Sequence, residues 1–274
     1  MKKLTRIASV PLLALASLSS CSKSQSPAAK LVLTGSSTVA PLAAEIGKRF
    51  ESLHPGIRVN VQMGGSSRGI ADARSGLTDI GMASRSLKDA EKDLHAFTIA
   101  RDGICVILHR SNPVTTLSNE QVVAIYTGAV DNWKQLGGDD APITVVNKAE
   151  GRSTLELFLH YFAIKNSDIH PDVVIGDNEQ GIKTVAGNPH AIGYVSIGTA
   201  KYDATHGVAI KLLPVNGVAA TLGNVSNGTF PLSRPLNLVT KSEPTGLALE
   251  FIEFARSKQV HDIVKEQYFV PLSG

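Results

Sequence analysis

The chain has 274 residues, of which 43% are hydrophobic, 19% are charged and only 5% are aromatic, and its formal net charge is +3. This length allows one large or two modest domains with full cores, and the composition is that of an ordinary globular protein. The small net charge and the scarcity of aromatic residues argue against nucleic acid as a partner.

The first twenty residues have the composition of an export signal. Three basic residues, Lys2, Lys3 and Arg6, precede an uncharged apolar run at 7–18 that is too short to span a bilayer as a helix. We therefore predict a signal peptide over residues 1–20. It implies a location outside the cytoplasm, in the periplasm or at the cell-envelope surface.

The end of this segment carries the first of two cysteines. Residues 18–21, Leu-Ser-Ser-Cys, resemble the lipobox of bacterial lipoproteins, which predicts lipidation at Cys21 and a lipid anchor in a membrane. Residues 21–29 have the small and polar character of a tether. An ordinary signal peptide that contains a cysteine by chance is the alternative. Cys105, the second cysteine, lies in an apolar run and is predicted to be a buried, unpaired thiol.

From residue 30 onward, strands and helices alternate. Apolar residues at helical spacing predict a helix over 39–53, and apolar–polar alternation predicts a strand over 57–63. This alternation predicts an α/β fold with a mostly parallel sheet and helices on both faces. The further elements expected are helices at 69–74, 86–94, 119–126, 153–162, 180–185 and 246–267 (long or bent), strands at 78–83, 97–108, 143–147, 173–175, 191–195 and 235–240, and a loop or hairpin at 216–231.

Three strands end in loops of similar chemistry. Gly-Ser-Ser-Thr at 35–38 forms the first loop, Met-Gly-Gly-Ser-Ser-Arg-Gly at 63–69 the second, and Glu-Gly-Arg-Ser-Thr at 150–154 the third. A loop of this kind points hydroxyls and free backbone N–H groups of a helix N-terminus at one place, which suits an anion. Hydroxyl residues before a helix are often only caps. Three such loops in two α/β halves predict one small anion in a cleft between two lobes.

Five stretches in this order resemble the substrate-binding lipoproteins of bacterial phosphate ABC transporters, the PstS type. They are TGSSTVAP at 34–41, GSSRG at 65–69, DIGMASRSL at 79–87, IYTGAVDNW at 125–133 and AIGYV at 191–195.

The resemblance implies a two-lobed periplasmic binding protein fold of type II, with the ligand cleft between the lobes. The expected division is a first lobe of residues 30–108 plus 236–274 and a second lobe of residues 109–235. The chain is expected to cross between the lobes near 107–110 and again near 232–237.

The resemblance also implies a set of phosphate-binding residues. In the third loop, Lys148 stands where the family usually has arginine, and Arg152 stands where it usually has serine, so the cation is expected at one of these two positions. An arginine there can clamp an anion with two hydrogen bonds. The full set expected to bind phosphate is Ser36, Ser37, Thr38, Ser66, Ser67, Ser84, Arg85, Lys148, Arg152, Ser153 and Thr154.

The expected function is capture of inorganic phosphate and its delivery to the transmembrane subunits of an ABC permease by a monomer. Residues 83–85, Ala-Ser-Arg, lack the aspartate with which some members accept the proton of phosphate. Sulfate, molybdate or tungstate therefore remain alternative ligands, and a sensing or adhesive role remains an alternative function. An exported phosphatase is disfavoured, because the sequence offers no Ser/His/Asp set that could activate one of the loop serines. The scattered histidines predict no metal, and no cofactor is expected.

Overall fold

The computed structural model describes residues 29–272. The expected signal peptide at 1–20 and the expected lipidation site Cys21 lie outside the described residues. The same holds for the predicted tether except for Ala29, which begins the first strand. None of the helices within the described range is long and apolar enough to cross a membrane.

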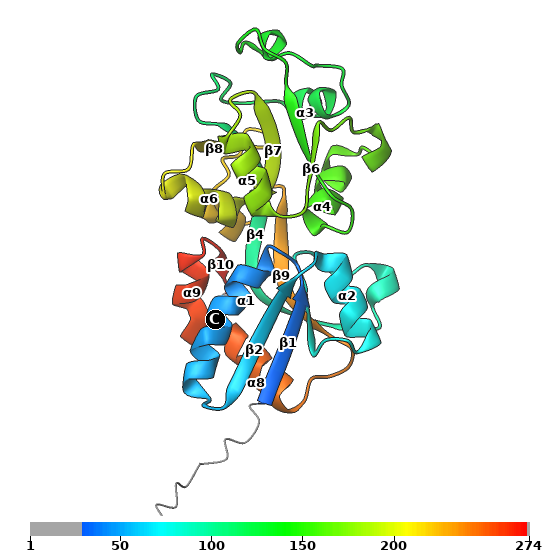
Figure 1. Cartoon of the computed structure of the whole chain (residues 1–274), viewed down its shortest axis with the longest axis vertical. Coiled ribbons are helices and arrows are strands. Elements are labelled where there is room, and N and C mark those ends of the chain that lie inside the picture. Colours follow the sequence, from blue (N-terminus) through cyan, green and yellow to red (C-terminus); the bar gives the residue numbers. More distant parts are fainter. Residues whose placement is uncertain (1–28, 273–274) are drawn as a thin grey trace, which may run out of the picture.

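Two lobes lie one above the other and are joined by two strands (Figure 1). Each lobe has its own apolar core: one core draws on residues 31–100 and 236–269, and the other on residues 104–232 together with Val270. We call the first of these the first lobe and the other the second lobe. Trp133 and Tyr126, both fully buried, pack in the core of the second lobe.

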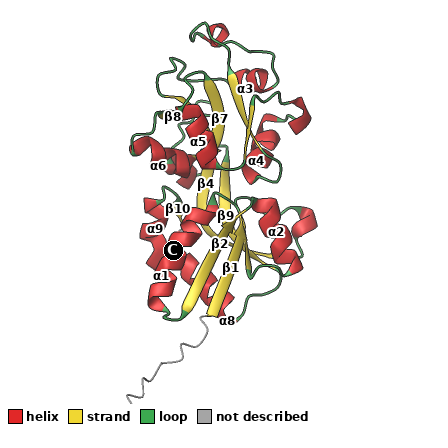
Figure 2. Cartoon of the chain, in the orientation of Figure 1, coloured by secondary structure: helices red, strands yellow, loops and turns green. Residues whose placement is uncertain are grey.

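Strands and helices alternate through both lobes (Figure 2). In chain order the elements are β1 (Ala29–Gly35), α1 (Val39–Leu53), β2 (Ile57–Met63), α2 (Ser66–Ser75), β3 (Ile80–Ala83), β4 (His95–His109), α3 (Asn119–Tyr126), β5 (Thr144–Lys148), α4 (Ser153–Phe162), β6 (Val173–Ile175), α5 (Asn178–Ala186), β7 (Ala191–Ser196), α6 (Ile197–Thr205), β8 (Ile210–Leu212), α7 (Leu222–Ser226), β9 (Ser233–Thr240), α8 (Gly246–Arg256), α9 (His261–Glu266) and β10 (Val270–Pro271).

One mixed sheet runs through both lobes in the order β2-β1-β3-β9-β4-β7-β5-β6. The outer pairs, β2 with β1, β1 with β3, β7 with β5 and β5 with β6, are parallel. The inner strands β4 and β9 are antiparallel to each other and to their other neighbours. The expectation of a mostly parallel sheet is therefore wrong at its centre, because β4 leaves the first lobe and β9 returns to it in the opposite direction.

Strand β4 changes partner part-way along its length. It pairs with β9 as far as Gly103 and with β7 from Ile104 onward. The backbone N–H of Ile104 donates to Leu232 O at 3.0 Å, just before β9 begins. We therefore propose lobe boundaries at residues 103/104 and 232/233, a few residues earlier than the sequence suggested.

Several elements begin and end as expected, among them α1, β2, α3, α4 and β6. Helix α2 begins earlier than expected, at Ser66, because the hydroxyl residues of the second loop form its first turn. The prediction of a helix at 86–94 is wrong, because only a short 3-10 turn forms there, at Asp89–Glu91. In this turn the Glu91 carboxylate accepts from the N–H of Lys88. The last long helix is broken at Ser257 into α8 and α9, and α7 forms within the expected loop at 216–231.

The first two loops touch through glycines. A Cβ atom on Gly69 of α2 would lie 2.6 Å from Thr34 O, 2.7 Å from Met82 O and 2.8 Å from the Cα of Gly35. All three contacts are with backbone atoms, so a Cβ at this position could be accommodated only by moving α2 or the strands at a cost in stability. Glycine at this position therefore lets α2 lie against β1 and β3 and brings the first and second loops together.

We predict that Gly69→Ala lowers the free energy of unfolding by about 1–3 kcal/mol, the usual cost of overpacking. Urea unfolding of the ligand-free protein measures this. The matched control is Gly223→Ala in α7, where the nearest atom to the new Cβ would be 3.9 Å away. The control should leave stability unchanged or slightly raised, and an equal loss in both variants would contradict the prediction.

Candidate anion-binding site

The three loops meet around one small cavity between the lobes. The first and second loops connect β1 to α1 and β2 to α2, and the third connects β5 to α4. The interlobe cavity has about 160 Å³ of empty space, open solvent included, so it suits a small ligand. It is lined by Ser36, Ser37, Thr38, Gly65, Ser66, Ser84, Arg152, Ser153 and Thr154.

Helices α1, α2 and α4 all begin at the interlobe cavity, with Val39, Ser66 and Ser153 as their first residues. A helix N-terminus carries unpaired backbone N–H groups and the positive end of the helix dipole. Within the described chain no carboxylate lines the cavity. Three helix N-termini and the absence of a lining carboxylate together favour an anion.

The guanidinium of Arg234 binds hydroxyls from both lobes. Arg234 is the second residue of β9, and its side chain is only 1% exposed. Nη1 donates to Thr154 Oγ1 at 2.9 Å and to Ser84 Oγ at 3.3 Å, and Nη2 donates to Thr38 Oγ1 at 3.2 Å. One buried side chain therefore connects the first loop, the end of β3 and the third loop.

Asp102 of β4 balances the charge of Arg234. The Oδ2 atom of this fully buried carboxylate accepts from Nη2 at 2.8 Å and from Nε at 3.1 Å. Its Oδ1 accepts from the backbone N–H of Gly198 at 3.3 Å. Together with the three hydroxyl contacts, these bonds engage all five N–H donors of the guanidinium. Arg234 therefore acts on a ligand through its charge and through the hydroxyls that it holds.

The bonds from Arg234 decide which way two hydroxyls point. Thr38 Oγ1 accepts from Arg234 and from Asn178 Nδ2 at 3.1 Å, and Ser84 Oγ accepts from Arg234 and from Ser36 Oγ at 3.0 Å. A hydroxyl oxygen has two acceptor lone pairs and one proton. Because both lone pairs are occupied, Thr38 and Ser84 can offer only a proton to the cavity. The surrounding hydrogen bonds therefore allow both hydroxyls to act only as donors towards a ligand.

The other buried serines of the cavity differ in what they can still bind. Ser36 Oγ accepts from the N–H groups of Thr38 and Val39 at 3.2 and 3.3 Å, so its proton is the one that bonds Ser84. Ser66 Oγ accepts from the N–H of Ser84 at 3.1 Å and keeps its proton. Ser153 Oγ, in a residue only 2% exposed, has no hydrogen-bond partner within residues 29–272. Ser36 therefore supports the wall, whereas Ser66 and Ser153 are available to a ligand.

Arg152 places a positive charge in the wall of the interlobe cavity. Its side chain reaches across to the second loop, since a Cβ atom on Gly65 would lie 3.2 Å from Arg152 Nη1. On its other side, a Cβ on Gly176 would lie 3.4 Å from Nη2. The guanidinium is therefore held between the two lobes.

Lys148, by contrast, lies behind the third loop at the end of β5. It is 3% exposed, and its Nζ donates to Asp177 O at 2.8 Å and to Asn178 Oδ1 at 3.0 Å. The pKa of Lys148 is lowered to about 7, mainly by burial and also by the charges of Arg234 and Arg152, whereas the charge of Asp177 acts to raise it. The lysine does not line the cavity and is connected to it by hydrogen bonds through Asn178 to Thr38.

Arg85 and Ser67 bind a carboxylate rather than the cavity. Arg85 Nε lies 2.9 Å from Glu156 Oε2 on α4, and its Nη atoms donate to Glu91 at 2.6 and 2.9 Å. Ser67 Oγ donates to Glu156 Oε1 at 3.2 Å, and Lys88 Nζ lies 2.9 Å from Glu156 Oε2. Glu156 thus ties α4 of the second lobe to three residues of the first. Arg85, which the resemblance placed among the phosphate-binding residues, is paired with Glu91 and Glu156 and does not line the cavity.

Eight of the eleven predicted site residues line the interlobe cavity, and Ser67, Arg85 and Lys148 do not. The sequence reasoning missed Arg234, Asp102 and Asn178. One signal was present: Asp102 and Arg234 are charged residues within or beside apolar strand segments, which suggests a buried pair. Their partnership across 132 residues has no local signal in the sequence.

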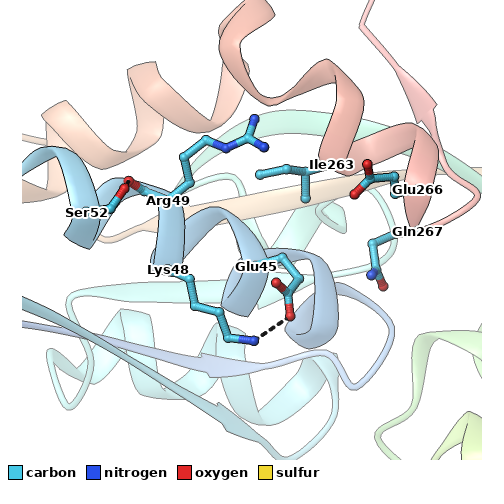
Figure 3. Close-up of a pocket in the computed structure, with 7 residues that line it drawn as sticks. All are labelled: Glu45, Lys48, Arg49, Ser52, Ile263, Glu266 and Gln267. Carbon is cyan, nitrogen blue, oxygen red and sulfur yellow. Dashed lines mark hydrogen bonds and ion pairs between the residues drawn. The ribbon is translucent and has the colours of Figure 1, made fainter.

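A second, wider pocket lies on the surface of the first lobe between α1 and α9 (Figure 3). Three of its charged lining residues form ion pairs: Lys48 pairs with Glu45 at 2.7 Å, and Arg49 pairs with Asp262 at 2.7 Å. Glu45 is six residues beyond the start of α1, about 9 Å along a helix. This pocket is thus separate from the three loops.

Comparison with known proteins identifies the family. The model of a PBP superfamily domain matches residues 22–259. The chain is 29% identical over 248 residues to the phosphate-binding protein PstS of Bacillus subtilis strain 168, covering 89% of this chain and 81% of that one. It is 36% identical to a putative phosphate ABC transporter substrate-binding protein of Clostridium perfringens, solved with bound phosphate; the TM-score is 0.81, and the match covers 89% of this chain and 100% of the other.

The chain belongs to the PBP superfamily, among the PstS-type proteins. A further relative is an ABC-type phosphate transport receptor from Vibrio cholerae, with 30% identity, a TM-score of 0.72 and coverage of 89% of this chain and 100% of that one. The two-lobed fold that the sequence predicted is confirmed by these family members. Within the described residues no group of three or more His, Cys, Asp or Glu side chains is placed to hold a metal ion.

We predict that Asp102→Asn lowers the free energy of unfolding by about 3–5 kcal/mol, because it leaves the buried charge of Arg234 without its counter-ion. Denaturant unfolding of the ligand-free protein measures the loss. Asp262→Asn removes the carboxylate of a solvent-exposed arginine pair and is the matched control, with only a small expected effect. Equal effects of the two variants would show that burial of the Arg234 pair is unimportant.

A second prediction concerns pH. The pKa of Lys148 is about 7 in the folded chain, against an ordinary value of 10.5, so between these values the unfolded chain holds a proton that the folded chain has released. The contribution of Lys148 to the free energy of unfolding therefore rises as pH increases from about 7 towards 10.

Urea midpoints measured across this pH range should rise less steeply in Lys148→Met than in the wild type. Lys134→Met, which removes an exposed lysine, is the control and should keep the wild-type slope. Parallel curves of urea midpoint against pH for the wild type and Lys148→Met would rule out a lowered pKa of Lys148 in the folded chain.

Proposed function

We propose that this protein captures inorganic phosphate between its lobes, outside the cytoplasm, and delivers it to an ABC-type phosphate permease. The observation that carries the proposal is the arrangement around Arg234, which holds hydroxyls of both lobes so that Thr38 and Ser84 donate into one small cavity. A tetrahedral oxyanion needs such donors from several directions. The names of the PstS relatives support phosphate as the anion.

The site is suited to binding rather than to chemistry. In the part of the chain that the structure describes, the lining residues include no histidine and no carboxylate that could serve as a general base. Hydroxyl donors, three helix N-termini and Arg152 stabilise the anion where it lies. We therefore propose a binding protein without catalytic activity, in preference to a phosphatase.

The proposal extends to the location of the protein. Export by residues 1–20 and lipidation at Cys21 would hold a monomeric two-lobed receptor at a membrane on the outer side, next to its permease. The family of the chain supports this arrangement.

Another tetrahedral oxyanion is the second candidate. Because the interlobe cavity is lined by no carboxylate of the described chain, fully ionised sulfate would meet no like charge in the wall. A carboxylate in this place would repel sulfate and accept the proton of phosphate.

Isothermal titration of the purified protein with phosphate, sulfate, arsenate and molybdate decides between these candidates. We expect phosphate to bind at micromolar concentration and more tightly than the other anions. Absence of a phosphate response at that concentration would contradict the proposed function. Tighter binding of sulfate than of phosphate would identify sulfate as the ligand.

Removal of single donors should weaken this binding. We predict that Ser66→Ala and Ser84→Ala each cost about 1–3 kcal/mol of phosphate affinity, because an oxygen of the anion is left without its donor. Ser75→Ala, at the far end of α2, is the control: its exposed hydroxyl bonds only to carbonyls of its own helix. Unchanged affinity in both site variants would place the ligand elsewhere.

A further inference from the structure

Asn178 is the first residue of α5. Its side chain lies between Lys148 at the end of β5 and Thr38 of the first loop. It is 4% exposed. Its Oδ1 accepts from Lys148 Nζ at 3.0 Å, and its Nδ2 donates to Thr38 Oγ1 at 3.1 Å and to Thr199 Oγ1 at 3.3 Å. The Thr38 bond crosses from the second lobe to the first. Every polar atom of the amide is thus engaged.

The lysine fixes which way the amide faces. Lys148 Nζ donates to Asp177 O and to Asn178 Oδ1. In its protonated form the group has only donors, so the amide atom that it contacts is the oxygen. The NH₂ group is then turned towards Thr38. Because Thr38 Oγ1 also accepts from Arg234, both of its lone pairs are occupied and its proton is left for the cavity.

We propose that Lys148 and Asn178 are positioning residues, which act on the bound anion by holding the Thr38 hydroxyl as an obligatory donor. This inference rests on the proposed function, because it explains how the same site binds its anion. It also gives Lys148 an indirect role. The charge in the cavity wall is that of Arg152, whereas Lys148 fixes the direction of the hydrogen bonds that run through Asn178 to Thr38.

The proposal predicts an unusual order of effects at position 178. In Asn178→Asp, a carboxylate that only accepts would face Thr38, and the threonine proton would turn to it and away from the anion. In Asn178→Leu, Arg234 still occupies one lone pair of Thr38, and the proton stays available. Asn178→Asp should therefore weaken phosphate binding on the order of 10-fold more than Asn178→Leu.

A double-mutant cycle separates this effect from the repulsion between the new carboxylate and phosphate. In a Thr38→Val background the charge of Asn178→Asp is still present, but the hydroxyl is gone. We expect the additional loss caused by Asn178→Asp to shrink on the order of 10-fold there. Equal losses in the two backgrounds, measured by isothermal titration with inorganic phosphate, would overturn the proposal.

Lys148→Met distinguishes an indirect from a direct role of the lysine. We expect it to weaken phosphate binding in the wild type and to have little further effect in Asn178→Leu, where there is no amide to orient. The same loss in both backgrounds would mean that the lysine acts on the anion directly, and this would overturn the proposal.

The contact itself can be tested without ligand. The shifts in urea midpoint caused by Lys148→Met and Asn178→Leu should be non-additive in the ligand-free protein, because the two residues share one hydrogen bond. Additive shifts would overturn the proposal whatever the protein binds. A wild-type protein that shows this coupling but does not respond to phosphate would contradict the proposed function alone.

Discussion

The ion pair between Arg234 and Asp102 is the interaction on which the site depends. Burying both charges is costly unless every donor and acceptor is satisfied, and here all five donors of the guanidinium are engaged. The two residues are register partners on the antiparallel strands β9 and β4, which are also the strands that join the lobes. The crossing point of the fold and the positive centre behind the cavity are therefore the same place.

Several contacts between the lobes surround this ion pair. The Arg234 guanidinium holds Thr154 of the second lobe, Asn178 of that lobe binds Thr38 of the first, and Glu156 binds Arg85 and Lys88 at the side. A ligand that bonds to hydroxyls of both lobes adds to the same set of contacts, so it favours the closed arrangement by its differential affinity. Binding and closure thus draw on shared groups.

The third loop and the strand before it carry two cations in different surroundings. Lys148 is buried behind the loop, and the guanidinium that lines the cavity is that of Arg152. A lysine could not clamp an oxyanion with two parallel bonds. As a point charge it is better suited to orient a neighbouring amide, which is its position against Asn178.

Local signals in the sequence predicted several of the elements and the chemistry of the three loops. Periodicity gave α1 and β2 their bounds, and Gly-Ser-Ser-Thr after a strand indicated an anion-binding turn, because these signals are local. The sequence could not reveal the Arg234–Asp102 pair, the Asn178 bridge or the diversion of Arg85 to Glu91 and Glu156, since each joins segments that only folding brings together. Tertiary structure decided which charges face the cavity, because a buried cation is stable only where folding supplies a counter-ion or hydrogen-bond acceptors for it.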